Sequence, residues 1–423
     1  MGEPAPVSRW KAAVADVAES SGLLAVLEQV PDPRDARGRR YRLSSLLAVA
    51  LCAVATGARS FYAIADWVGG VSPEVLKRLG IRFRVPSESA IRLAIGRVDG
   101  GVLDRVLGAH LAATATPPGQ RLQVALDGKT VRGARNGDTV APHLVAAITH
   151  DGATVLGQRR IDSKSNEIPA VRRLLATIDV AGAVVTVDAM HTQKATARYL
   201  RERCKADYVM TVKANQPRLL ARVKSQPWAQ VPVVWEEPVQ RGHGREEQRS
   251  YKIVTVARGL AFPYAKQVAQ ITRRRRRLGT QTWSAEVVYV ICSVPAEAAP
   301  ARLLTAWIRG HWSIENKLHW VRDVTFDEDR SQVRVGNAPQ VMATLRNTII
   351  SLHRRAGHTN MESGTNRGRS RRQRLSISSV GEAGIPAAAR ANRLPSLPSP
   401  ICPALQLGAL FVLEPVLRHR NDL

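Results

Sequence analysis

The first third of the chain carries apolar residues at helical spacing. The spacing holds over residues 8–30 and 84–113, whereas the run "LSSLLAVALCAVATG" at residues 43–57 is apolar on every side and predicts a buried helix. That run is too short to cross a membrane. The pattern predicts an all-helical domain over residues 19–115, preceded by a leader at residues 1–18.

Two interpretations of this helical domain stay open. Its short helices, tight turns and basic flanks would suit a helix-turn-helix-like module that binds DNA. A plain helical bundle would produce the same pattern, and no set of groove-reading residues separates the two.

Beyond residue 120 the pattern changes to strands that alternate with helices. "RLQVALDG", "AGAVVTVDAM" and "ADYVMTVKANQ" are strand-like, two further strands flank the turn "HDG" within residues 143–161, and amphipathic helices lie between them. This order is typical of an α/β domain with a mixed sheet, which we expect over residues 120–358. Residues 230–296 instead hold strand-like segments with charged turns, among them "RRRRRLG", and predict a β-rich insertion.

The last part of the chain, residues 359–423, has no regular pattern. It is rich in Ser, Arg and Pro, a composition typical of a disordered tail. A frameshift or an aberrant gene end would also produce such a sequence, and the protein could then fold poorly or be inactive.

Charge gives the first indication of function. The 423 residues include 62 Lys and Arg against 35 Asp and Glu, for a formal net charge of +27. A field of this sign favours a polyanionic partner, of which nucleic acid is the commonest. An anionic membrane is the alternative, but no strongly amphipathic basic helix stands out.

The cysteines and the start of the chain bear on the compartment. The four cysteines are scattered, without metal-binding spacing or the density of a disulfide scaffold, and no secretory signal opens the sequence. We therefore expect a cytoplasmic protein, associated with the nucleoid through its nucleic-acid partner.

Two of the predicted strands end on an aspartate, Asp127 and Asp188. An acid adds no stability to an apolar strand, since an unpaired carboxylate near a core is costly. At adjacent strand ends the two carboxylates would converge and repel, unless a cation such as Mg²⁺ or Mn²⁺ lies between them. The alternative is a pair of acids that face solvent or cap the next helix.

A third acid would complete a site for two ions, of the kind that activates water in phosphodiester chemistry. Glu315 is the candidate, because "HWSIENKLHWVR" is helical and places Arg322 two turns further along the same face. An exposed helix with ordinary ion pairs is the alternative. Rival ligands follow in a cluster that is more typical of a loop balancing nearby arginines: Asp323, Asp327, Glu328 and Asp329.

Six separated segments resemble a known family. They are "ALDGKTVRGAR", "KSNEIPA", "VTVDAMHTQ", "YVMTVKANQ", "HWSIENKLHWVRDVTFDEDRS" and "RVGNAPQVMATLRN". Together they resemble the DDE transposases of bacterial insertion sequences, in the H-repeat-associated (ISAs-type) family. The resemblance covers residues 20–358 in the family's order, and a chance match of six ordered segments is not expected.

The resemblance implies a fold and a set of site residues. The fold is a ribonuclease H-like core, an α/β mixed sheet with the β-rich insertion before the last acid, preceded by the helical family-associated domain. Asp127, Asp188 and Glu315 match the first, second and third catalytic acids, which are also the metal ligands. Arg322 matches the basic position that the wider superfamily places after its glutamate.

The match upstream of the glutamate is poorer. The tyrosine and arginine of the wider superfamily fall on Ile308 and His311 in this chain, so Arg309 is the candidate for the arginine's role.

The resemblance also implies an activity. A DNA strand is hydrolysed at the transposon end, and the freed 3′-hydroxyl then attacks target DNA, with two Mg²⁺ or Mn²⁺ ions and no covalent enzyme intermediate. The partner is double-stranded DNA, and the pairing of two ends implies a homodimer. An inactive or domesticated DNA-binding remnant, or a metal-dependent nuclease without strand transfer, are the alternatives.

Basic residues near the acids and on the insertion are candidates for phosphate contacts, with solvated turns as the alternative. Contacts of this kind would make binding strongly dependent on salt. The candidates are Arg322, Arg309, Lys129, Arg132, Lys213, Arg273, Arg274 and Arg275.

Overall fold

The fold is seen in a computed structural model that describes residues 22–357, apart from 114, 116–118, 138–139, 162–166, 243 and 257–259. The predicted leader and the predicted tail lie outside the described residues. The chain divides into two compact units. The first comprises residues 1–97 and 352–423, and the second comprises residues 98–351.

The described part of the first unit is helical. Its helices are α2 (Leu23–Glu28), α3 (Leu43–Ala55), α4 (Phe61–Gly69), α5 (Pro73–Arg78) and α6 (Glu88–Arg97), with a 3-10 turn η1 (Ala36–Gly38). Every residue of α3 is buried, which confirms the buried helix predicted from its uniform apolarity. Ser60 and Ser72 cap α4 and α5, since each side chain accepts a hydrogen bond from a backbone N–H of the first turn.

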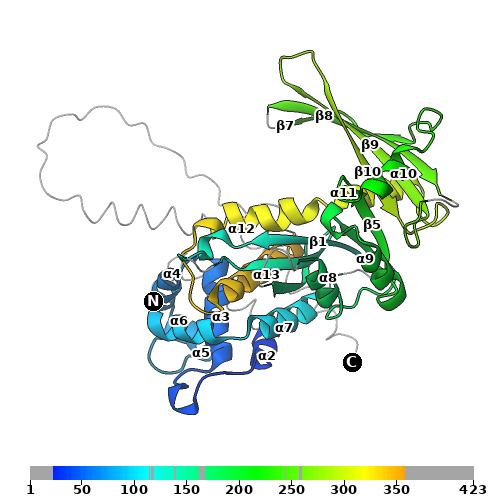
Figure 1. Cartoon of the computed structure of the whole chain (residues 1–423). Helices are drawn as coiled ribbons and strands as arrows, with labels where there is room; N and C mark the ends of the chain where they lie inside the picture. Colours follow the sequence, from blue (N-terminus) through cyan, green and yellow to red (C-terminus); the bar gives the residue numbers. More distant parts are fainter. Residues whose placement is uncertain are drawn as a thin grey trace, which may run out of the picture. The chain divides into compact units, whose positions relative to one another are not determined.

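The second unit is built on one sheet of ten strands (Figure 1). The order is β3-β2-β1-β4-β5-β10-β9-β8-β6, and β7 pairs with β8. The strands are β1 (Gln123–Thr130), β2 (His143–Thr149), β3 (Val155–Ile161), β4 (Val184–Val187), β5 (Asp207–Val212), β6 (Trp235–Glu236), β7 (Gln240–Gly242), β8 (Arg245–Thr255), β9 (Gln267–Arg277) and β10 (Ser284–Cys292).

The strand directions confirm the predicted mixed sheet. β1, β2 and β3 are antiparallel neighbours, whereas β1, β4 and β5 run parallel. This order and these directions are those of a ribonuclease H-like core. β10 pairs antiparallel with β5 and with β9, so the β-rich insertion continues the core sheet as a long ribbon.

Helices cover both faces of the core strands. Val124 and Leu126 of β1 and Val185 and Val187 of β4 pack with α8 (Glu167–Leu175) and α9 (Lys194–Arg198) on one face. The alternate positions of the sheet, such as Val184, pack with α11 (Ala301–Gly310) on the other. The helices of this unit are α7 (Gly100–Ala112), α8 (Glu167–Leu175), α9 (Lys194–Arg198), α10 (Pro217–Lys224), α11 (Ala301–Gly310), α12 (Trp320–Val324) and α13 (Ala338–Arg355, whose last four residues belong to the first unit).

Helix α7, which the sequence pattern places with the helical domain, packs in the second unit against β3. Gly108 makes the close approach possible, because a Cβ there would lie 2.5 Å from the carbonyl oxygen of Leu156. Among the helices in the described ranges, none combines the length and apolarity that crossing a bilayer requires.

Candidate active site

The alternation of side chains along β1 and β4 places Asp127 and Asp188 on one face. The strands are parallel, and Leu126 pairs with Val187 in the last shared row of the register. Both of these side chains lie in the core with α8 and α9. Asp127 is the next residue on β1, and Asp188 directly follows β4 with an extended backbone, so both point toward the α11 side.

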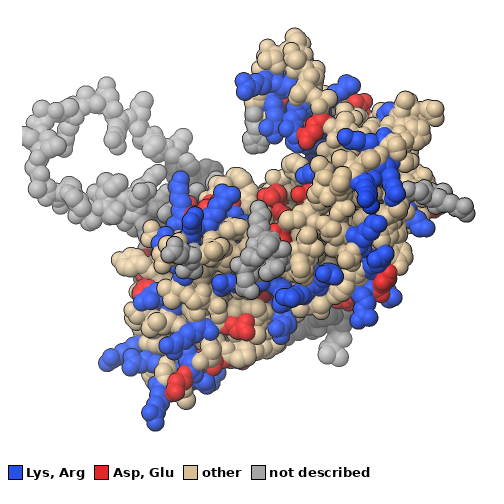
Figure 2. Space-filling model, in the orientation of Figure 1, with Lys and Arg blue, Asp and Glu red and all other residues tan. Residues whose placement is uncertain are grey.

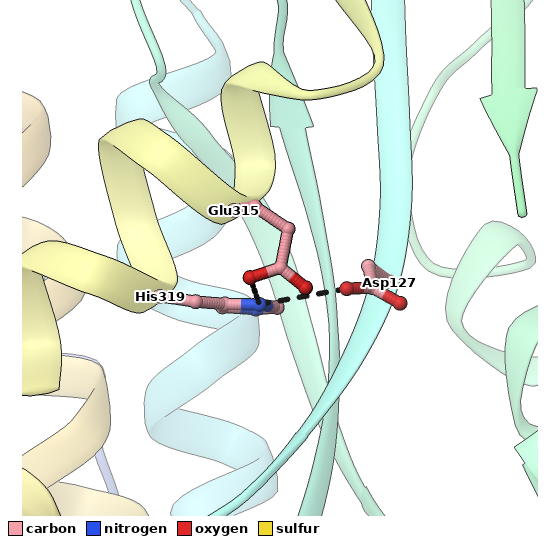
Figure 3. A group of neighbouring side chains, drawn as sticks. All are labelled: Asp127, Glu315 and His319. Carbon is pink, nitrogen blue, oxygen red and sulfur yellow. Dashed lines mark ion pairs between the residues drawn. The ribbon is translucent and has the colours of Figure 1, made fainter. Parts of the chain in front are cut away.

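Glu315 reaches the same place from the helical segment that follows α11. It is the first residue of a π-helical turn, η6 (Glu315–His319). Ligand atoms of Asp127, Glu315 and His319 all lie within 4.8 Å of one another. Figure 3 shows the two carboxylates turned toward each other, with the His319 ring beside them. Its Nδ1 lies 3.5 Å from Asp127 Oδ2 and 3.6 Å from Glu315 Oε2.

Asp188 lies beside this group but is not one of the three residues with converging ligand atoms. Its side chain is 47% exposed, and Oδ1 accepts a hydrogen bond of 3.4 Å from Lys213 Nζ. The structure therefore brings two of the three predicted acids together and leaves the third half-exposed at the neighbouring strand end, with Lys213 as its partner.

The paired carboxylates repel. Burial raises the pKa of Asp127 to about 8, and the neighbouring charge of Glu315 adds to the shift. The hydrogen bond from His319 brings the pKa of Glu315 down to about 2. At neutral pH the protonated Asp127 then donates to the ionised Glu315. A divalent cation would replace that proton and remove the repulsion, so the donor set fits an oxygen-binding ion.

A hydrogen-bonded layer fixes the end of α11 against the sheet. Thr186 Oγ1 lies 2.9 Å from His150 Nε2 and 3.1 Å from His311 Nδ1. Burial lowers the pKa of His150 to about 3 and that of His311 to about 4, so both rings are neutral. Gly310 permits the approach, because a Cβ there would lie 2.1 Å from His150 Nδ1. These contacts set the helix that leads into Glu315.

His319 follows Glu315 by four residues and so shares its side of the helix, a position that suits a metal and phosphate site, but it is not among the predicted site residues. Burial lowers the pKa of His319, and its Nδ1–H donates toward the acids. It therefore orients the Glu315 carboxylate.

The structure does not place Arg322 where the predicted phosphate contact requires it. Its side chain is fully buried, with Nε 2.9 Å and Nη2 2.6 Å from Glu328 Oε1. The π-helical turn at Glu315–His319 changes the helical phase, because each of its hydrogen bonds spans one residue more than in an α-helix. Arg322 is therefore rotated away from Glu315 and into the core.

The rival acids after Glu315 form ion pairs with basic residues. Asp323 Oδ2 lies 2.6 Å from Lys129 Nζ, and Asp329 Oδ1 lies 3.8 Å from the same atom. The Lys129 side chain is only 9% exposed and is engaged in these ion pairs. Arg132 lies 3.6 Å from Asp329, but its side chain is 79% exposed. Glu328 is held by Arg322 and by Arg346, whose Nη1 is 2.8 Å away.

The arginine run of the insertion is predicted to form a charged turn, and this prediction is wrong. Residues 273–277 lie in β9. The strand continues because it pairs with β8, where Glu246 and Glu247 balance part of the charge. Arg273 and Arg275 face Glu247, at 2.7 and 3.5 Å, whereas Arg274 is exposed.

Arg309, the candidate upstream arginine, is 41% exposed and lies 3.3 Å from Glu237. Arg273 also stacks over the Trp312 ring, with its guanidinium carbon 5.2 Å from the ring centroid. Both contacts connect the insertion to the segment that carries Glu315.

Comparisons with known proteins bear on this site. Residues 118–352 match the family model described as "Transposase DDE domain", and residues 24–111 match the one described as "DDE_Tnp_1-associated". The "Putative transposase YncI" of Escherichia coli O157:H7 is 29% identical over 348 residues, which are 78% of this chain and 87% of that protein. The "H repeat-associated putative transposase YhhI" of E. coli strain K12 is 28% identical over 346 residues, 79% of this chain and 90% of that protein.

A solved structure, a piggyBac transposase synaptic complex with hairpin DNA, aligns with 89% of this chain and 84% of that chain. Its TM-score of 0.40 and identity of 10% are too low to support a conclusion. The family match does not depend on this structure, since the "Transposase DDE domain" model alone spans more than half of the sequence. The chain therefore belongs to the DDE transposase family of DNA-cleaving and DNA-joining enzymes, and the relatives that it resembles include an H-repeat-associated putative transposase.

Proposed function

We propose that the chain is an insertion-sequence transposase that cuts the ends of its element and joins the freed 3′-hydroxyl to target DNA. Asp127, Asp188 and Glu315 would hold two Mg²⁺ or Mn²⁺ ions. One observation carries the proposal: the carboxylates of Asp127 and Glu315, far apart in sequence, meet within ligand distance at the strand end beside Asp188.

The residues of the site have distinct tasks in this proposal. Asp127 and Glu315 would hold the ions, one from β1 and the other from the π-helical turn, with His319 orienting the Glu315 carboxylate. Asp188, half-exposed on the parallel strand next to β1, would complete the set of ligands. When bound, divalent ions supply an activated water or hydroxyl nucleophile and balance the charge of the leaving oxygen.

Positive charge on the insertion supports DNA binding. The paired segments 245–249 and 273–277 contain seven arginines against two glutamates. Burial and the nearby charges of Arg309 and Arg273 lower the pKa of Arg249, which shows how crowded these cations are. In Figure 2 Lys and Arg side chains gather on the end of the β8–β9 ribbon. The surplus suits a phosphate backbone, and Arg274, Arg273, Arg275 and Arg309 stay candidates for it.

Removal of two exposed arginines of the ribbon tests this surface. Arg274→Ala combined with Arg277→Ala should weaken DNA binding and reduce the slope of log Kd against log salt by about 2, because each lost phosphate contact removes about 0.9. The matched control is Arg105→Ala with Arg160→Ala, two exposed arginines at the β3 edge. Equal salt slopes for the two double variants, measured by fluorescence anisotropy, would contradict a DNA-binding role of the ribbon.

The activity itself is tested with DNA that carries the inverted ends flanking the gene, together with a target plasmid. In Mg²⁺ or Mn²⁺ the protein should nick the end, expose a 3′-hydroxyl and yield joined products, and EDTA should abolish both steps. Nicks without joined products would identify a nuclease, and neither product in either ion would identify an inactive remnant. Two copies of the chain on paired ends, seen by light scattering of the DNA complex, would support the proposed homodimer.

A further inference from the structure

A buried carboxylate lies between two histidines on the face of the sheet opposite Glu315. Glu167, the acid of the segment "KSNEIPA", is 2% exposed. Its Oε2 lies 2.8 Å from His143 Nε2, and its Oε1 lies 3.0 Å from His191 Nε2. Both oxygens of one carboxylate are therefore bound by rings from two other segments, and we call the three residues the Glu167 cradle.

Each histidine of the cradle connects to a segment that carries a site acid. His191 lies three residues after Asp188, in the 3-10 turn η4 (Ala189–His191). His143 is bound on its other side, where Nδ1 lies 2.8 Å from the Thr130 hydroxyl, three residues after Asp127 on β1. One carboxylate thus links the two strand ends.

The backbone of β1 also rests directly on the cradle. A Cβ at Gly128, the residue after Asp127, would lie 2.5 Å from Glu167 Oε1 and 2.5 Å from His143 Nε2. Only glycine allows the strand to lie this close. Because side chains alternate along β1, the cradle supports the strand from one face while Asp127 projects from the other.

The cradle keeps a negative charge inside the protein. Burial alone would raise the pKa of Glu167, but the hydrogen bonds from His143 and His191 bring it down to about 2. The charge of Glu167 also contributes to the raised pKa of Asp127, so Glu167 lies close enough to influence the site electrostatically. The charge is held by rings from two other segments, so its position fixes where those segments lie.

We propose that Glu167 is a positioning residue, which sets the separation of Asp127 and Asp188 through Gly128, His143 and His191 so that both can bind the same metal ions. The inference rests on the proposed function, since it assumes that these acids bind metal. Glu167 itself is buried, so in this proposal it positions the acids and does not serve as a ligand. Groups behind metal ligands typically change metal affinity or activity by about 10–100-fold.

Glu167→Gln is the first test. The neutral amide offers one acceptor oxygen and one donor NH₂ group in place of two charged acceptor oxygens, so it cannot accept from both rings and the charge that holds them is lost. Mn²⁺ binding, followed by the electron paramagnetic resonance signal of the free ion, should weaken by about 10–100-fold. The Mn²⁺ concentration for half-maximal cleavage should rise by the same factor, whereas the rate at saturating Mn²⁺ should recover in large part.

Gly128→Ala is a second test that leaves the chemistry of the cradle intact. The added methyl would displace the Glu167 carboxylate, the mobile end of a side chain, and should weaken Mn²⁺ binding in the same way. This variant decides the matter if Glu167→Gln does not fold.

The control is Asp207→Asn, which removes a partly buried carboxylate, 15% exposed, that Arg121 and Arg201 bind at the start of β5. It should lower the melting temperature and leave Mn²⁺ affinity unchanged. Wild-type Mn²⁺ affinity in both Glu167→Gln and Gly128→Ala would overturn the inference and leave the metal site standing. Absence of Mn²⁺ binding by the wild-type protein would overturn the proposed function together with it.

Discussion

Asparagine in place of Asp127 is expected to abolish DNA cleavage and, at the same time, to raise the melting temperature of the metal-free protein near pH 7. The loss of cleavage should exceed the roughly 10–100-fold caused by changes behind a metal ligand, because a ligand itself is removed. The stabilisation follows because the folded wild type keeps a proton on Asp127 that the unfolded chain has already released at this pH, whereas an uncharged amide carries no such cost.

The pH dependence of this stabilisation has a definite sign. The pKa of Asp127 is raised from 3.8 to about 8, so between these values the folded state holds a proton that the unfolded state has lost. Wild-type stability therefore falls as pH rises through this window, and Asp127→Asn should gain on the wild type over the same range. Thermal unfolding in EDTA from pH 4 to pH 9 measures the gap, which should be absent at the acid end and level off above about pH 8.

Asp151→Asn is the control for both measurements, because Asp151 is an exposed aspartate on the β2–β3 turn. It should cut DNA like the wild type and melt at the same temperature. Cleavage at the wild-type rate by Asp127→Asn would show that Asp127 is not a catalytic residue. A lower melting temperature would mean that the Asp127 carboxylate stabilises the folded protein.

The strand pattern is enough to predict that Asp127 and Asp188 share one face. Two parallel strands that each carry an acid directly after a buried apolar residue must direct both acids the same way when their registers match, although β1 continues past Asp127 to Thr130. The pattern also separates the mixed core from the insertion. It does not predict that β10 joins β5, since two neighbouring β segments can equally form a separate sheet.

The helical side of the site is harder to predict. Periodicity identifies the helix around Glu315 but not the face of the sheet that it covers, and only the family resemblance places Glu315 with the aspartates. A π-helical turn has no signature in apolar spacing, so Arg322 is assigned to the wrong face. The sequence pattern predicts a turn at the arginines of β9, because the acids that balance their charge, Glu246 and Glu247, lie on the neighbouring strand β8.

Glutamine in place of Glu328 is the second large effect, and it acts on stability. The carboxylate is fully buried between Arg322 and Arg346, which are 0% and 1% exposed. Removal of one partner from a buried ion pair leaves the other charges uncompensated, at a cost of about 3–5 kcal/mol in the free energy of unfolding. Arg346 would lose its ion-pair partner, and its Nε and Nη2 already lack hydrogen-bond partners among the described residues.

Acid should produce the same loss in the wild-type protein. Burial opposes ionisation of Glu328, but the two arginines bring its pKa from 4.5 down to about 2. Its stabilising contribution is therefore complete above pH 4.5 and is lost as pH falls toward 2. Glu328→Gln should lack this part of the acid sensitivity, so its deficit relative to the wild type should shrink in that range.

Urea unfolding followed by circular dichroism measures both effects, with Glu286→Gln as the control. Glu286 is 61% exposed and pairs with Arg275 at 3.3 Å, and a surface pair of this kind contributes about 0–1 kcal/mol. A loss of stability in Glu328→Gln no larger than in this control would mean that Arg322 and Arg346 find other partners. Arg322 would then be able to leave the core, and the phosphate contact expected from the family's basic position would become possible again.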